Sequence, residues 1–340
     1  MTPGSNTYGL PSTIEVVIVG ASPDRINHNA IMRHFVHDGF AATLGAHRVT
    51  ECPLEPAIAT VDKLRPRLVL CFGSCMPDVS DYGPLRDLCD RVGVKLAFWL
   101  HDDPYEFDFA FKATEVADFV FSNDRWATRH YDHPHVQFLP MAACPNAHSR
   151  PWVSDKRHDV FFCGVGFPNR VRILSDLQPF LGALRCEVLG AEWPDSLKVA
   201  QNKRLTNAEV ADGCAASLVT LNMGRDLHLA NRRYQLDPST PGPRTFEAAM
   251  AGTVQLCFVD GLEIADYFKI GDEILVFDDP ASFRQQVESL LDDPLRAKRI
   301  ALAARERVLK DHTYEQRARQ LLACCGWSQS EIMSEVDLVK

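Results

Sequence analysis

The chain of 340 residues has 46% hydrophobic and 24% charged side chains and a formal net charge of -9. This length exceeds what one hydrophobic core usually supports, so the sequence predicts two domains of an ordinary globular protein. The acidic balance argues against a protein whose main task is to coat nucleic acid.

Signals for export, membrane insertion and disulfide bonding are not found in the sequence. No apolar run is long enough to span a bilayer, and residues 1–13 lack the basic and apolar parts of a secretion signal. We therefore expect a cytoplasmic protein with no membrane span. The 11 cysteines are odd in number, and several, such as Cys71 and Cys163, lie in strand-like runs. They are expected to be reduced core residues, and their spacing predicts no metal site.

Short apolar runs alternate with helical segments, which is the pattern of parallel strands joined by crossover helices. In the first half, the predicted strands are 14–20, 67–73, 95–100, 118–122 and 136–140. In the second half, they are 159–164, 186–190, 216–222, 254–259 and 273–279. Residues 141–158 lie between the two sets, are rich in proline and polar residues, and are expected to link two domains.

These patterns predict an α/β fold with two Rossmann-like, doubly wound domains that face each other across a cleft. Residues 1–150 would form the first domain and residues 151–312 the second. Ligands of such sheets bind at the carboxyl ends of the strands, so the residues that follow each strand are the first candidates for a site.

In the first domain, two strand ends carry candidate residues. Gly20 and Ala21 follow the first strand and would let the backbone approach the cleft, although "GASPDR" lacks the full GxGxxG pattern. His101, Asp102 and Asp103 follow the strand 95–100. His101 or Asp103 could bind or deprotonate a substrate hydroxyl, because histidine titrates near neutral pH. The alternative is that Asp102 or Asp103 caps a helix.

In the second domain, "GVGFPNR" follows the strand 159–164. Its glycines allow close backbone approach to a ligand, and Arg170 could neutralise a diphosphate; the alternative is a tight turn with a solvated arginine. Asn222 ends the strand 216–222 and would contact a ligand or cap a turn.

Residues 223–243 form a long segment with no predicted element, which is typical of a lid or a disordered loop. Three arginines in this segment could bind phosphate, but we interpret them as a solvated charge cluster: Arg225, Arg232 and Arg233.

The stretch "GPRTFEAAMAGT", residues 242–253, is predicted to be a helix that begins near Arg244 and ends at Gly252. Its amino terminus would face the cleft, where unpaired amides and the helix dipole favour a phosphate group. Arg244 adds a full charge at the same end. The Glu247 carboxylate lies about one turn in and could accept hydrogen bonds from two sugar hydroxyls.

This stretch and the segment "YFKIGDEILVFDDPASFRQQVESLLDDPLRAKRIALAARERVLKDHTYEQRARQLL" resemble the carboxyl-terminal half of nucleotide-sugar glycosyltransferases of the GT-B fold. The likeness is to the CgeB-like group, of the spore maturation protein type. "WLHDDPYEFD" and "DVFFCGVGFPNR" also resemble motifs of that group, so that the resemblance spans most of residues 95–325. It implies a donor site in the second domain, acceptor groups mainly in the first, and a C-terminal helix, 313–340, that crosses back to the first domain.

Related retaining transferases have two glutamates separated by seven residues in this region. Glu247 matches the second glutamate, and its implied role is to hold the ribose of the nucleotide. Ser239 stands where the first glutamate would be, which bears on the contacts to the donor sugar and on retention. The expected donor-binding set is Gly164, Gly166, Asn169, Arg170, Asn222, Gly242, Arg244, Thr245 and Glu247.

Together these features predict a glycosyltransferase that moves a sugar from a nucleoside diphosphate sugar, with UDP as the expected nucleotide, to an acceptor hydroxyl. Arginines and helix amides would replace a divalent metal, the anomeric configuration would be retained, and no cofactor besides the donor is expected. The acceptor is not determined and a homodimer is left open. Two alternatives remain: a sugar-nucleotide epimerase on the same fold, and a noncatalytic nucleotide-binding protein.

Overall fold

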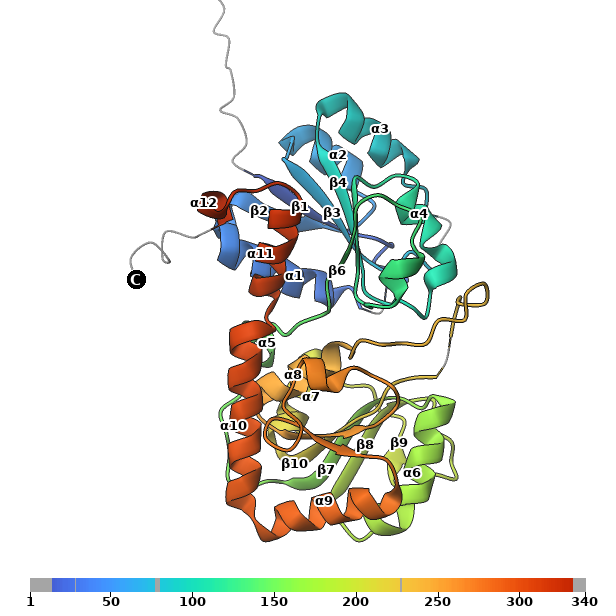
Figure 1. Cartoon of the computed structure of the whole chain (residues 1–340), viewed down its shortest axis with the longest axis vertical. Helices are drawn as coiled ribbons and strands as arrows, with labels where there is room; N and C mark the ends of the chain where they lie inside the picture. The colour runs from blue at the N-terminus through green and yellow to red at the C-terminus, as the bar shows by residue number, and fades with distance from the viewer. Residues whose placement is uncertain (1–13, 28, 77–79, 227, 333–340) are drawn as a thin grey trace, which may run out of the picture.

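The computed structural model describes residues 14–27, 29–76, 80–226 and 228–332. It contains two α/β units stacked along the long axis of the molecule (Figure 1). Residues 1–13 and the last part of the expected C-terminal helix, 333–340, lie outside the described residues.

The first sheet has six parallel strands in the order β2-β1-β3-β4-β5-β6. In chain order its elements are β1 (Val16–Gly20), α1 (Ile31–Leu44), β2 (Val49–Cys52), α2 (Ala57–Leu64), β3 (Leu68–Gly73), α3 (Gly83–Val92), β4 (Lys95–Leu100), α4 (Phe111–Thr114), β5 (Phe119–Ser122) and β6 (Val136–Phe138). Alternate residues of its strands enter two core clusters, one under α1 and the other under α2 and α3. Both faces are therefore buried, which is why the strands read as continuous apolar runs.

The second sheet also has six parallel strands, in the order β12-β11-β10-β7-β8-β9. Its elements are α5 (Pro145–His148), β7 (His158–Val165), α6 (Pro168–Leu181), β8 (Cys186–Ala191), β9 (Ala200–Gln201), α7 (Asn207–Ala215), β10 (Ser217–Asn222), α8 (Pro243–Ala251), β11 (Val254–Phe258), β12 (Leu275–Phe277), α9 (Pro280–Asp292) and α10 (Pro294–Asp311). This strand order is that of the dinucleotide-binding α/β fold, and it reverses between β7 and β10.

The chain returns to the first unit after α10. α11 (Tyr314–Cys324) packs against α1, and α12 (Gln329–Ile332) follows it (Figure 1). Gly39 of α1 makes this approach possible, because a Cβ there would lie 2.4 Å from the carbonyl carbon of Tyr314. The two chain segments that connect the units run side by side, because the Ala143 amide donates to the His312 carbonyl and the Tyr314 amide donates to the Ala143 carbonyl. The domain limits at residues 150 and 312 stay predictions.

The structure confirms the ten predicted strands and adds β2 and β9, which the sequence reading missed. β2 is an edge strand whose Thr50 and Glu51 are partly exposed, and β9 has two residues, so neither produces an apolar run. The predicted linker is not free of structure either, because it contains α5 and its first residues are buried in the core of the first unit.

Candidate active site

The carboxyl ends of strands from both sheets meet where the two units face each other. In the second sheet, the order reverses between β7 and β10, and the loops that follow these two strands touch each other at Arg170 and Gly224. In the first sheet, His101–Asp103 follow β4. An ion pair of 2.8 Å between Arg225 and Asp102 joins the two loops across the interface. These are the positions at which open α/β sheets bind their ligands.

The Asp102 carboxylate contacts the Nδ1 side of the His101 ring. Its Oδ2 lies 3.3 Å from Nδ1 of His101, and its Oδ1 accepts from Arg225. Burial opposes ionisation of Asp102, but the charges of His101 and Arg225 outweigh burial and lower the pKa of Asp102. Burial also disfavours charge on His101, yet the Asp102 carboxylate prevails and raises the pKa of His101 above 6.5. The result is an imidazole oriented at Nδ1 with Nε2 left for another partner.

Two further carboxyl groups lie behind this pair. Asp103 accepts hydrogen bonds from the hydroxyls of Ser122 (2.6 Å) and Tyr131 (2.5 Å), and burial raises the pKa of Asp103 to about 6. Glu106 accepts from Ser74, and burial together with the Asp102 charge raises the pKa of Glu106 to about 7. Asp102, Asp103 and Glu106 line a cavity of about 10 Å³, room for one water molecule. Asp103 begins no helix, so the cap interpretation is wrong for it.

Arg170, at the start of α6, is a cation held by backbone carbonyls. Its guanidinium donates to the carbonyls of Gly224 (2.9 Å), Met223 (2.9 Å) and Val165 (3.1 Å). Within the described ranges, no carboxylate lies within ion-pair distance of it. Burial and then the charge of Arg225 lower the pKa of Arg170 to about 10. A partly buried cation with neutral partners and cationic neighbours favours an incoming anion.

The amino terminus of α8 brings Arg244 close enough for its charge to contribute to the lowered pKa of Arg170. Gly242 is its N-cap, no side chain caps it, and a Cβ at Gly242 would meet no described heavy atom within 4 Å. Arg244 lies 3.3 Å from a Glu247 oxygen and keeps about 35% of its side chain exposed. Glu247 is buried, and its other oxygen lies 3.7 Å from Nε2 of His148. The Glu247 carboxylate therefore already has Arg244 and His148 as neighbours, and no sequence pattern pointed to His148.

Asn222 and Thr245 position this helix. The Asn222 amide donates to the Thr245 hydroxyl (2.7 Å) and to the Gln255 side chain (3.1 Å), and all three residues are buried. The Gln255 amide in turn donates to the Thr245 carbonyl. These bonds fix the start of α8 on β10 and β11, so the contacts found for Asn222 and Thr245 are structural.

The glycines expected to admit a ligand are packed by the protein itself. A Cβ at Gly166 would lie 2.6 Å from the Glu192 carbonyl oxygen, and one at Gly164 would lie 3.1 Å from the Arg170 guanidinium. A Cβ at Gly20 would lie 3.0 Å from Arg33. Ala21 is fully buried, with its amide bonded to the Phe72 carbonyl. At these positions, the short contacts that a small residue permits are made with other parts of the protein.

Ser239, at the position of the absent glutamate, binds a carboxylate of the other unit. Asp124 accepts hydrogen bonds from the backbone amides of Ser239 (2.7 Å) and Thr240 (3.0 Å) and from the Ser239 hydroxyl (3.1 Å). Asp124 also caps the turn at Trp126 and Ala127. A glutamate here would bring a second carboxylate against Asp124, so the replacement by serine is consistent with this contact.

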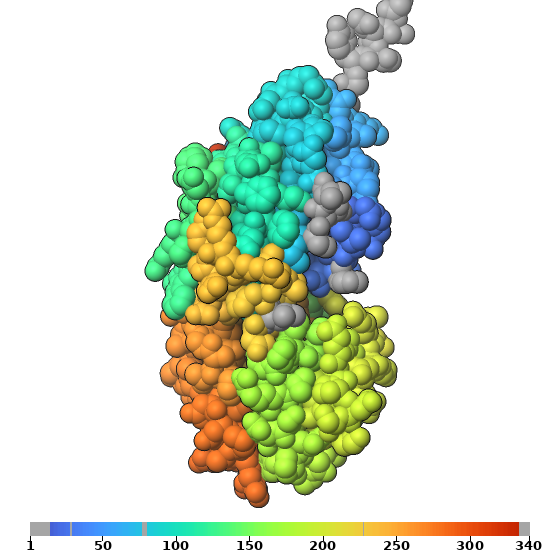
Figure 2. Space-filling view, turned by 90° about the vertical axis from the view of Figure 1, so that its right-hand side faces the viewer, coloured from blue at the N-terminus to red at the C-terminus, as the bar shows by residue number. Residues whose placement is uncertain are grey.

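The described residues of the segment 223–243 pack against the first unit, and one of its three arginines is not solvated. Figure 2 shows its surface lying against the first unit. Tyr105 accepts at its carbonyl from the amides of Leu229 and Ala230, and Leu236 is buried in the first core. Arg225 stacks on the Tyr105 ring at 3.8 Å with 18% of its side chain exposed, which corrects its interpretation as a solvated residue. Arg232 and Arg233 are exposed, as expected.

Four buried polar atoms in this region lack a hydrogen-bond partner in the part of the chain that the structure describes. They are His101 Nε2, Asn169 Oδ1, Arg225 Nε and Asp260 Oδ1. Unsatisfied buried groups are costly, so several of them at the meeting of two loops indicate a surface shaped for a polar ligand. The sequence reading did not select Glu106, Asp124 or Asp260, because each gains its role through contacts formed only on folding.

Comparisons with known proteins bear on the family and the fold of the chain. Residues 170–323, just under half of the chain, match a family model described as glycosyl transferase-like. No protein among the curated sequences compared matches the chain. The family match supports an enzyme of the glycosyltransferase class, and the two-sheet architecture is that of the GT-B fold. No helix of the described residues is long and apolar enough to cross a membrane.

Several solved structures share the fold. HepE from Anabaena, in complex with UDP and glucose, has a TM-score of 0.60 at 9% identity and covers 92% of this chain and 99% of its own. Sucrose-phosphate synthase from Thermosynechococcus elongatus has a TM-score of 0.57 at 12% identity, and the match covers 91% of this chain and 98% of that protein. A putative UDP-N-acetylglucosamine 2-epimerase from Listeria monocytogenes has a TM-score of 0.55 at 10% identity, and the match covers 92% of this chain and 96% of that protein. At these identities the likeness establishes the fold alone.

Proposed function

We propose that the enzyme moves a sugar from a UDP-sugar to an acceptor hydroxyl, and that arginines take the place of a divalent metal at the diphosphate. The observation that carries this proposal is Arg170, a partly buried cation with no carboxylate partner among the described residues, at the switch point of the second sheet. Arg225 and Arg244 are close enough for their charges to lower the pKa of Arg170. Three cations beside the uncapped start of α8 suit a leaving diphosphate.

The first unit would serve the acceptor. His101 is oriented at Nδ1 by Asp102 and has no hydrogen-bond partner at Nε2 within the described ranges, which is the arrangement of a general base. We propose that Nε2 of His101 binds the acceptor hydroxyl and takes its proton. Asp102 would orient the ring, and its ion pair with Arg225 would connect it to the donor site. Asp103 would act as a positioning residue, because Ser122 and Tyr131 already engage its carboxylate.

Finer features of the proposal rest on the sequence resemblance. The CgeB-like group, retention of configuration and a ribose contact from Glu247 are supported by "RTFEAAMAG" and the segment that follows it. The burial of Glu247 beside Arg244 is compatible with that contact. A cytoplasmic location and a homodimer stay predictions.

Titration with UDP tests the proposal, with Arg225→Gln as the main variant and Arg232→Gln as its matched control from the same segment. We expect Arg225→Gln to weaken UDP binding about 10-fold or more, since a hydrogen bond to a charged group contributes about 1.5–3 kcal/mol. Uridine binding should change little, and Arg232→Gln should match the wild type. Equal UDP affinity in all three proteins, or no binding of UDP, GDP or dTDP by the wild type, would contradict the proposal.

The epimerase alternative shares the fold, as the Listeria structure illustrates. Incubation with a UDP-sugar alone separates the two activities. An epimerised donor would replace the transferase proposal, whereas an unchanged or hydrolysed donor agrees with it.

A further inference from the structure

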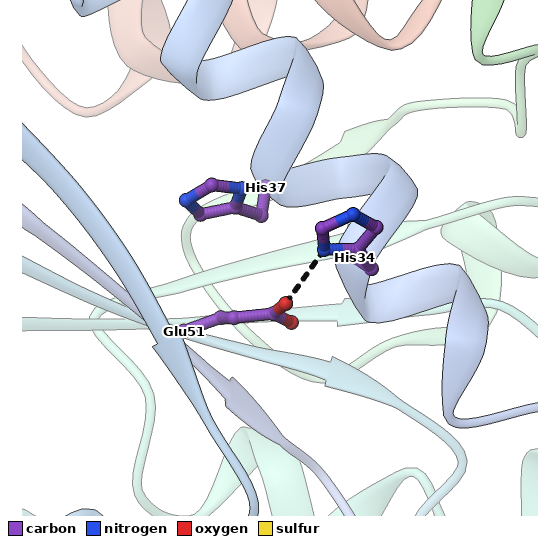
Figure 3. Close-up of side chains that lie close together, drawn as sticks. All are labelled: His34, His37 and Glu51. Carbon is purple, nitrogen blue, oxygen red and sulfur yellow. Dashed lines mark hydrogen bonds and ion pairs between the residues drawn. The ribbon is translucent and has the colours of Figure 1, made fainter. Parts of the chain in front are cut away.

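A second group of reactive side chains lies on the first unit and shares no residue with the candidate active site. α1 presents His34 and His37, and the neighbouring strand β2 presents Glu51 (Figure 3). One potential ligand atom from each residue lies within 4.8 Å of the others. Nδ1 of His34 is 2.9 Å from Oε1 of Glu51.

The local fold produces this arrangement. Residues three apart on a helix lie on the same side, so His34 and His37 point together, and their rings are nearly parallel with centroids 5.8 Å apart. Ligand atoms around one tetrahedral zinc ion, each at roughly 2.0–2.2 Å, are about 3.3–3.6 Å apart, so the three side chains would have to move closer together around an ion. The side chain of His34 is 53% exposed, which leaves this ring room to move.

Neighbouring residues hold the group from outside. Arg33 donates to Oε2 of Glu51 at 3.1 Å and leaves Oε1 facing His34. Oδ1 of Asp38 lies 3.5 Å from Nδ1 of His37 and 3.8 Å from Nε2 of His34. Within the described ranges, Nδ1 of His37 is buried without a hydrogen-bond partner. Outer carboxylates that orient ligand imidazoles are a regular feature of protein metal sites.

We propose that His34, His37 and Glu51 bind a divalent transition metal ion of the zinc type, with water completing the coordination. Two imidazoles and one carboxylate are ligands that zinc accepts, and the ion would tie α1 to the edge strand β2. The site is independent of the proposed transferase, because the diphosphate lies with the arginines of the second unit. Cysteine spacing predicted no metal, and it could not detect a site built from a helix and a strand.

Calorimetric titration of the full chain with zinc chloride tests the site. We expect one tight zinc ion per chain in the wild type. His34→Gln, His37→Gln and Glu51→Gln should each weaken binding at least as much as the roughly 10- to 100-fold that loss of an outer partner costs. Two controls should bind like the wild type: His135→Ala, an exposed histidine of the same unit, and Cys324→Ser, an exposed thiol.

Thermal unfolding separates loss of the site from loss of the fold. Without metal, His34→Gln should melt with the wild type, and zinc should raise the melting temperature of the wild type but not that of the variant. The proposal is overturned if the wild type binds no zinc, if the three ligand variants bind it as tightly as the wild type, or if Cys324→Ser is the variant that loses it.

Discussion

The two sheet edges that face each other between the units have opposite chemistry. The edge of the first unit carries His101, Asp102 and Glu106, and the edge of the second carries Arg170 and Arg244. Burial makes each charge costly, and the two edges differ in how they compensate for this cost. Burial raises the pKa of Asp103 to about 6 and that of Glu106 to about 7, whereas the Arg170 guanidinium is held by backbone carbonyls. One side is therefore suited to proton transfer and the other to anion binding, which is the division of labour that a transferase requires.

The largest effect is expected at His101. His101→Asn should lower kcat about 100-fold or more, since general-base catalysis contributes roughly 10²–10⁴, and it should leave UDP affinity unchanged. Because Asp102 raises the pKa of His101, wild-type activity should fall as the pH drops through a value above 6.5. Steady-state kinetics over pH 5–9 would measure both effects. A loss of UDP affinity as large as the loss of kcat would contradict the assignment of proton transfer to the first edge and donor binding to the second. His130→Ala, which changes an exposed histidine of the same unit, is the control.

Glu106 sets a pH dependence of stability on the first edge. Its pKa rises from 4.5 to about 7, so the folded state keeps a proton that the unfolded state releases. Its stabilising contribution is complete below pH 4.5 and is lost as the pH rises to about 7, by up to about 3 kcal/mol. Glu106→Gln should therefore melt higher than the wild type at pH 8 and close to it at pH 4.5. An equal difference at both pH values would refute this assignment.

Arg170 tests the second edge. Arg170→Lys keeps the charge but loses the fork that engages three carbonyls, so UDP affinity should fall about 10- to 100-fold while uridine affinity changes little. Arg172→Lys, an exposed arginine on the same helix, is the control. Titration with UDP and with uridine would show whether the loss of affinity is specific to the diphosphate. A parallel loss of uridine affinity would indicate general damage to the loop.

The smallest effect is expected at Glu247. If it holds the ribose, Glu247→Gln should reduce the preference for UDP over its 2′,3′-dideoxy analogue by about 10-fold, with a smaller change in diphosphate binding. Competition binding would measure the preference, and Glu306→Gln, an exposed glutamate, is the control. An unchanged preference would leave Glu247 as a structural partner of Arg244 and His148.

Sequence patterns predicted more of the fold than of the candidate site. The buried strands produce apolar runs because both faces of each sheet are covered. The contacts that build the site span long separations. Arg225 and Asp102 are 123 residues apart, and Ser239 and Asp124 are 115 apart. An irregular segment has no periodicity that could reveal which surface it will cover, so these pairs were not predictable.

A crystal structure with bound UDP would test the central claim most directly. The account predicts diphosphate oxygens within hydrogen-bond distance of the Arg170 or Arg244 guanidinium and of the backbone amides at the start of α8. It also predicts that His101 faces the nucleotide from the opposite edge. A diphosphate bound elsewhere, with Arg170 and the amino terminus of α8 uncontacted, would contradict it.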